Sequence, residues 1–158
     1  MTRILLTISI LLFSSLTFSQ TAKIDNYTLT IRKGKIVKES KQTYWVIPST
    51  ITNNSKDTLR YFSMSCSWQD FYTVDNKKLQ IETALCDKNS PTILTLAPGY
   101  SKTVEIRLLR RQSMDASEIK FKIGLNLMKS SNSQNPLDFN FEEEQKKKNI
   151  IWSNVISI

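Results

Sequence analysis

The sequence predicts an all-β protein, built as an antiparallel β-sandwich of seven to nine strands. Most of the chain alternates apolar and polar residues, and short clusters rich in Asn, Asp, Lys and Ser interrupt this alternation at close intervals. A period of two indicates a strand with one buried face. Short strands separated by frequent turn signals are typical of a sandwich.

Eight segments are expected as strands, and they are 26–34, 43–55, 58–68, 79–83, 92–96, 102–111, 119–128 and 149–158. Their alternation defines apolar faces that include Leu29, Ile31, Ile47, Ile51, Ile106, Leu108, Phe121, Ile123 and Leu125. In the last segment Trp152 is expected on the buried face together with Ile150 and Ile156. Turn signals lie between the strands, at 52–57, 74–78, 87–91 and 97–99.

The segment 135–149 departs from the alternation. Three acids precede three lysines there at a spacing of four, and they are Glu142, Glu143, Glu144, Lys146, Lys147 and Lys148. Such pairs support a helix when the acid is N-terminal. We expect either a short exposed helix or a solvated charged loop before the last strand.

The first nineteen residues predict a secretory signal peptide. Arg3 gives a positive start, 4–13 form an apolar stretch, and Thr17 and Ser19 are small residues at the positions that signal peptidase requires. Serines break the apolar run, which argues against a transmembrane span. We therefore expect cleavage near Ser19/Gln20, a single domain over 20–158, and a secreted or periplasmic protein.

The formal net charge is +8. This excess favours weak attraction to anionic surfaces, whereas scattered lysines also serve solubility and protect strand edges. The basic run at 107–111 is short and has no aromatic residues within it, so nucleic-acid binding is not expected.

The chain has two cysteines, Cys66 and Cys86. In an oxidising compartment two cysteines usually pair, so we expect a disulfide that closes a loop of about 20 residues. A reactive thiol or a metal pair is the alternative, and it lacks a histidine or another motif that would activate it.

Three stretches of the chain resemble extracellular bacterial immunoglobulin-like domains: ITNNSKDTLRYFSMSCSW, VDNKKLQIE and LTLAPGYSKTVEIRL. The resemblance covers about residues 45–109, and Pro98 and Gly99 form its tight turn. It implies an immunoglobulin-like β-sandwich. The composition, rich in Ile, Lys, Asn and Ser, resembles that of small secreted proteins of Gram-negative bacteria.

A cluster of aromatic and polar residues is the candidate ligand-binding site, and its members are Trp68, Gln69, Asp70, Phe71 and Tyr72. Aromatic rings stack on sugar faces while amides and carboxylates bind hydroxyls, so the cluster is compatible with a glycan site. The alternative is structural: Trp68 packs on the disulfide, Phe71 closes one end of the core, and Tyr72 lies at the surface.

No enzyme, cofactor or metal site is expected. The chain has no histidine, which excludes Ser-His-Asp and Cys-His arrangements and the common zinc sites. Four acids could in principle form a carboxylate pair, and they are Asp70, Asp75, Glu82 and Asp87, but nothing in their spacing selects one.

The sequence thus favours a secreted, non-catalytic binding module of the bacterial cell envelope, whose partner is an unknown protein or glycan. The alternative is a carbohydrate-binding accessory domain that uses the aromatic residues at 68–72.

Overall fold

The computed structural model describes residues 26–39, 42–83, 85–110, 118–130 and 149–158. These residues form an all-β structure with antiparallel sheets, consistent with the predicted β-sandwich. The expected signal peptide and almost all of the segment 135–149 lie outside the described residues. No helix within the described ranges is both long and apolar enough to cross a membrane.

The larger sheet has the strand order β1-β3-β8-β6, with β2 also paired to β3. Its strands are β1 (Tyr27–Ile31), β2 (Lys35–Glu39), β3 (Gln42–Asn53), β6 (Leu79–Ile81) and β8 (Ser101–Arg110). β1 and β2 follow one another along the same edge of β3, because β1 pairs with its C-terminal half and β2 with its N-terminal half.

The remaining strands are β4 (Leu59–Met64), β5 (Tyr72–Val74), β7 (Pro91–Leu96), β9 (Lys120–Phe121), β10 (Ile123–Asn126), β11 (Ile150–Trp152) and β12 (Ile156–Ser157). β10 lies between β11 and β5, β9 pairs with β12, and β4 pairs with β7. An antiparallel bridge from Tyr61 to Lys129 joins β4 to the chain that continues from β10. The bridge therefore links β11, β10 and β5 with β4 and β7 in a second group of strands.

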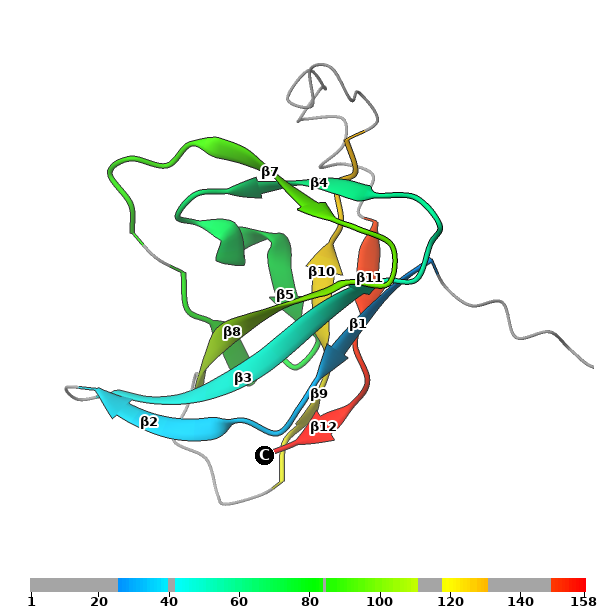
Figure 1. The fold of residues 1–158 in the computed structure, drawn as a ribbon. Coiled ribbons are helices and arrows are strands. Elements are labelled where there is room, and N and C mark those ends of the chain that lie inside the picture. Colours follow the sequence, from blue (N-terminus) through cyan, green and yellow to red (C-terminus); the bar gives the residue numbers. More distant parts are fainter. Residues whose placement is uncertain (1–25, 40–41, 84, 111–117, 131–148) are drawn as a thin grey trace, which may run out of the picture.

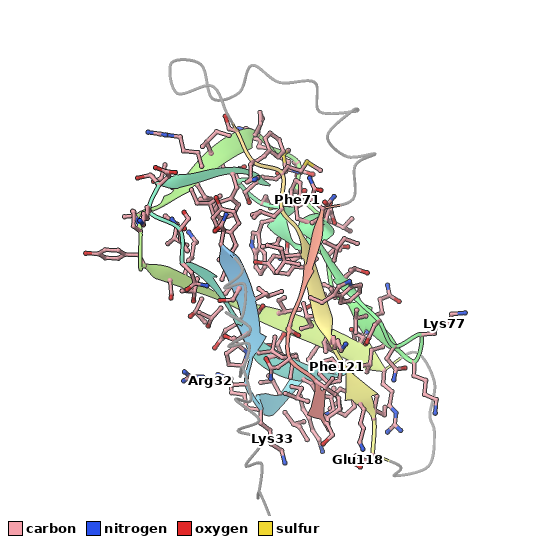
Figure 2. All side chains as sticks on the ribbon, turned by 90° about the vertical axis from the view of Figure 1, so that its right-hand side faces the viewer. Arg32, Lys33, Phe71, Lys77, Glu118 and Phe121 are labelled. Atoms are coloured by element: carbon pink, nitrogen blue, oxygen red, sulfur yellow. A yellow bond between two sulfur atoms is a disulfide. The ribbon has the colours of Figure 1, made fainter. Side chains whose placement is uncertain are left out.

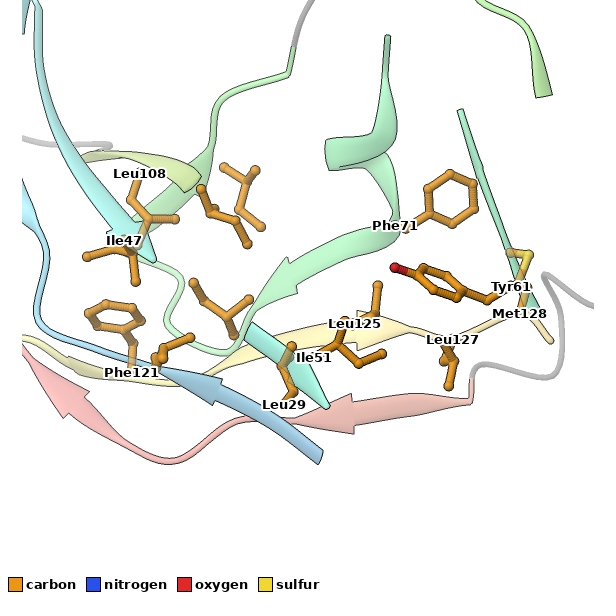
Figure 3. Close-up of a cluster of buried hydrophobic side chains, with 14 of the residues drawn as sticks. Leu29, Ile47, Ile51, Tyr61, Phe71, Leu108, Phe121, Leu125, Leu127 and Met128 are labelled. Carbon is orange, nitrogen blue, oxygen red and sulfur yellow. The ribbon is translucent and has the colours of Figure 1, made fainter. Parts of the chain in front are cut away.

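The core lies between the two groups of strands (Figures 1 and 3). Ile47, Ile106 and Leu108 come from the larger sheet, Phe121 and Ile123 from the other group, and each of these side chains is at most 1% exposed. Figure 2 shows the opposite behaviour of the charged side chains Arg32, Lys33 and Lys77, which point away from the molecule. The apolar faces predicted for the strands around Leu29, Ile106 and Phe121 are confirmed.

The described residues form twelve strands where eight segments were expected. β2 and β5 were not predicted. β2 has no buried residue, so it carries no alternation that the sequence could reveal. The other two arise because 119–128 and 149–158 each break into two strands: Asp75 binds the N–H of Lys122, and the hydroxyl of Ser153 accepts the N–H of Ile123 (3.0 Å).

The prediction that Trp152 is buried is wrong. Its side chain is 43% exposed and lies opposite Gly124, on the outer face of β10 and β11. The neighbouring Ile151 packs against the core instead. Because side chains of a strand alternate between its faces, Ile150 and Trp152 then point outward.

Asn53, at the end of β3, connects two turns. Its side chain is fully buried, and its amide donates to the carbonyls of Asp57 and Leu96, both at 2.8 Å. Its Oδ1 accepts the N–H of Ser55 (3.0 Å) and the Ser55 hydroxyl (2.7 Å). Because both the amide nitrogen and the oxygen of Asn53 have hydrogen-bond partners, the buried carboxamide is tolerated, and it ties the turn after β3 to the end of β7.

Two glycines are required by local geometry. Gly99 has a φ of +75° and follows Pro98 in a turn closed by the N–H of Tyr100 and the carbonyl of Ala97 (3.1 Å), as a type II turn requires. Gly34 lies between β1 and β2, where a Cβ would overlap the carbonyl oxygen of Val46. The predicted Pro98-Gly99 turn is therefore confirmed.

Ser49 provides a test of polar burial in the core. Its side chain is 1% exposed, and its hydroxyl has no hydrogen-bond partner among the described residues. An unsatisfied buried hydroxyl costs about 1–3 kcal/mol. We expect Ser49→Ala to raise the free energy of unfolding by about 1 kcal/mol, measured by urea denaturation.

Ser153 is the matched control, because it is also buried but its hydroxyl is satisfied: it accepts from Ile123 and donates to the carbonyl of Asn154 (2.8 Å). Ser153→Ala should lower the free energy of unfolding by about 1–2 kcal/mol. Equal destabilisation by both substitutions would contradict the assignment of Ser49 as unsatisfied.

Candidate functional site

The candidate site begins where β4 ends. The sequence predicts an unbroken strand over 58–68, and this is wrong: β4 stops at Met64 and the chain turns. The Asn89 side chain accepts the N–H groups of Cys66 (3.2 Å) and Ser67 (3.3 Å), which therefore bond to a side chain and not to a neighbouring strand. Trp68 consequently does not share a strand face with Cys66.

The predicted disulfide between Cys66 and Cys86 is confirmed, with their Cα atoms 6.2 Å apart. Beside it, the N–H of Ser65 donates to the carbonyl of Ser90 (2.9 Å), and the N–H of Ser90 donates to the Ser65 hydroxyl (3.0 Å). The covalent link and these hydrogen bonds hold the turn after β4 against the segment that precedes β7.

A short 3-10 helix, η1 (Trp68–Phe71), then positions the aromatic residues. The N–H of Asp70 donates to the carbonyl of Ser67 (3.1 Å) at its start. Trp68 meets Tyr72 edge to face, with ring centroids 5.8 Å apart, and Phe71 contacts Phe62 in a similar way at 5.6 Å. Phe71 and Tyr61 lie at one end of the core in Figure 3.

These aromatic side chains line a cavity of about 230 Å³, here called the aromatic cavity. In Figure 1 the β4–β7 pair lies above β3 and β8, with η1 between them. The cavity is bounded by side chains from all of these elements and from β5 and β10, and they are Ile51, Tyr61, Phe62, Ser63, Met64, Ser65, Trp68, Phe71, Tyr72, Thr92, Leu94, Lys102, Val104 and Leu125.

In the part of the chain that the structure describes, the lining is mostly apolar and carries a single charge. Lys102 is an exposed residue of β8, and its register partner on β3 is Ile51, which also lines the cavity. The other polar lining residues are the hydroxyl-bearing Ser63, Ser65 and Thr92 and the two tyrosines. A concave, mostly apolar space with a few polar groups is the usual form of a small-molecule site.

Burial raises the pKa of both cavity tyrosines above the ordinary value of about 10, at which a tyrosine is already neutral near pH 7. It raises the pKa of Tyr61 to about 12, and it raises the pKa of Tyr72 well above its ordinary value, with a further contribution from Tyr61. The expectation that Tyr72 lies at the surface is therefore wrong, since its half-buried ring packs against Trp68. The two phenols offer only uncharged hydroxyl groups near pH 7.

The structure separates the five predicted site residues. Trp68, Phe71 and Tyr72 line the aromatic cavity, whereas Gln69 lines a second hollow and Asp70 is exposed and lines neither. The rings thus face a cavity together and do not form a flat exposed platform.

The second hollow, of about 460 Å³, contains Arg107 beside Gln69. Arg107 pairs with Glu39 and Glu82, at 2.7 Å each, and its guanidinium lies 4.0 Å from the centre of the Tyr44 ring. Its charge is therefore already compensated, which makes this hollow a weaker candidate for a charged ligand.

The four acids considered for a carboxylate pair either take part in other interactions or are exposed. Asp75 accepts the N–H of Lys122 (2.7 Å), Glu82 pairs with Arg107, and Asp70 and Asp87 are exposed. Within the described part of the chain, no three Cys, Asp or Glu residues gather in a way that could hold a metal ion.

Most of the cavity lining was not predicted from the sequence, although one residue pattern pointed to it. Lys102 occupies the position that continues the inward alternation of Val104 and Ile106, so a lysine at the start of an apolar face marks it. Tyr61 could not be found in this way, because β4 is buried on both faces and Tyr61 and Phe62 are each less than 9% exposed.

Neither a comparison of the sequence with models of known protein families nor one with curated proteins finds a match.

Proposed function

We propose that this protein is a secreted, non-catalytic binding module of the bacterial cell envelope, and that it binds its ligand in the aromatic cavity. The observation that carries the proposal is the convergence of Trp68, Phe71 and Tyr72 on one partly open, mostly apolar cavity. A mostly apolar pocket with a few polar groups is the usual composition of a small-molecule site. The disulfide supports export to an oxidising compartment.

We also propose that the sandwich is immunoglobulin-like. The order β1-β3-β8-β6 corresponds to the A-B-E-D sheet of constant-type immunoglobulin domains, and β10 lies between β11 and β5 as strand F lies between G and C. One feature departs from the pattern. β7 follows β6, which takes the place of strand D in the larger sheet, yet β7 pairs with β4 in the other group of strands. Sandwiches of this kind serve many binding functions, so the site and not the fold carries the functional proposal.

The lining favours an apolar ligand over a sugar. The amide of Gln69 and the carboxylate of Asp70, which were expected to bind sugar hydroxyls, do not line the cavity. An apolar cavity of about 150 Å³ is known to accept benzene, so a space of 230 Å³ holds one aromatic ring.

Toluene is the probe for this proposal. We expect it to shift the backbone amide NMR signals of Trp68, Tyr72 and Leu94 in the wild-type protein. Leu94→Phe should abolish these shifts, because the added ring of a half-buried lining residue occupies the cavity. Added volume costs about 1–3 kcal/mol in a filled core, and less where it enters an empty cavity.

Thr95→Phe is the matched control, since Thr95 is the exposed neighbour of Leu94 on β7 and does not line the cavity. It should leave the toluene shifts unchanged. Absence of toluene binding to the wild type, or its survival in Leu94→Phe, would refute the proposed site. Shifts of the same amides by monosaccharides, without any response to toluene, would support the carbohydrate-binding alternative.

A further inference from the structure

We propose that the aromatic cavity binds a small organic acid, with its aromatic or aliphatic part inside the cavity and its carboxylate on Lys102. This inference rests on the proposed function and specifies the class of ligand. It follows from the placement of one lysine among the lining side chains.

Lys102 lies on the face of β8 that points toward the core. It follows the same alternation as Val104 and Ile106, and Val104 also lines the cavity. Lys102 is exposed, so its ammonium group stays hydrated at the rim while its aliphatic stem contributes to the apolar wall. A ligand that fills the cavity and extends to its rim therefore lies close to this positive charge.

The surrounding charges favour an anion. Among the described residues no acid lines the cavity, and no carboxylate forms an ion pair with Lys102. The two tyrosines that line the cavity carry no charge near pH 7, because the ordinary pKa of a tyrosine is about 10 and burial raises it further for both Tyr61 and Tyr72. The one charge at the cavity is thus available to a ligand.

A purely structural explanation of Lys102 is also testable. Charged side chains that point inward near the edge of a sandwich prevent two sheets from pairing edge to edge. In that case Lys102 has no preference for an acid, and its removal promotes self-association.

The experiment compares 4-methylbenzoate with 4-methylbenzamide, which have the same ring and differ in charge. Binding is measured by NMR titration at low ionic strength. We expect the acid to bind wild type about threefold more tightly than the amide, as a solvent-exposed ion pair allows. Lys102→Met should remove this preference while the affinity for the amide stays nearly unchanged. Salt should weaken binding of the acid only.

Lys77→Met is the control, because Lys77 is exposed, points away from the molecule and does not line the aromatic cavity, and its loss changes the net charge equally. It should keep the preference for the acid, as should Lys102→Arg. Equal affinity for acid and amide in wild type, or an unchanged preference in Lys102→Met, overturns the inference. If toluene and the amide bind but the acid is not preferred, only this inference fails; if toluene does not bind, the proposed function fails as well.

Discussion

Replacing Asn53 with alanine is expected to lower the free energy of unfolding by about 3 kcal/mol, because it leaves the buried carbonyl of Leu96 and the half-buried N–H of Ser55 without this partner and each such group costs about 1–3 kcal/mol. The substitution removes the donors that serve the carbonyls of Asp57 and Leu96 and the acceptor that serves Ser55. A loss of this size is a large share of the stability of a typical domain. Urea denaturation followed by tryptophan fluorescence measures it.

Asn54→Ala is the control for this prediction. Asn54 is the exposed neighbour of Asn53, and its side chain donates to the hydroxyl of Thr28 at the surface (3.2 Å). Its replacement should change the free energy of unfolding by no more than about 0.5 kcal/mol. If the two alanine variants unfold at the same urea concentration, Asn53 does not join the two turns in the way described.

Removal of the disulfide has the second largest expected effect. The link between Cys66 and Cys86 closes a chain segment with a sequence separation of 20, which corresponds to about 3 kcal/mol in the chain-entropy model. The double variant Cys66→Ser/Cys86→Ser should therefore unfold at a much lower urea concentration than the oxidised wild type. Reduction of the wild type should produce a similar loss and should leave the double variant unchanged.

We expect the disulfide to help position the cavity, because Trp68, which lines it, follows Cys66 by only two residues. The double variant should therefore bind toluene more weakly than wild type under conditions in which both are folded. Two titratable thiols in denatured, unreduced wild-type protein would contradict the predicted link, as would equal stability of the oxidised and reduced forms.

Local patterns predicted the inward faces of several strands correctly. In β1, β8, β9 and β10 the alternation holds, so Leu29, Ile106 and Phe121 are buried as expected. A strand with one buried face carries this information in its own residues, because successive side chains point to opposite sides.

The same rule failed where a strand was assumed to continue. An unbroken strand over 58–68 would place Trp68 on the same face as Cys66, but Asn89, 21 positions after Trp68 in the chain, binds the backbone at Cys66 and Ser67 and ends the pairing. In a similar way the Ser153 hydroxyl accepts the N–H of Ile123 where the C-terminal segment divides into β11 and β12. Such side-chain contacts come from distant parts of the chain, so no local window reveals them.

The amino-acid sequence by itself determined the all-β class, the apolar faces of the regular strands, the Pro98-Gly99 turn and the partnership of the two cysteines. The first three depend on residue types at short spacing, and the last depends on the chain having two cysteines. Only the tertiary structure decided the shape of the candidate site. The aromatic cavity combines Ile51, Trp68, Leu94, Lys102 and Leu125 from five separate segments, and its volume exists only where β4 and β7 pack over β3 and β8. Packing across the core is a property of pairs of segments, so the cavity has no signature in any one of them.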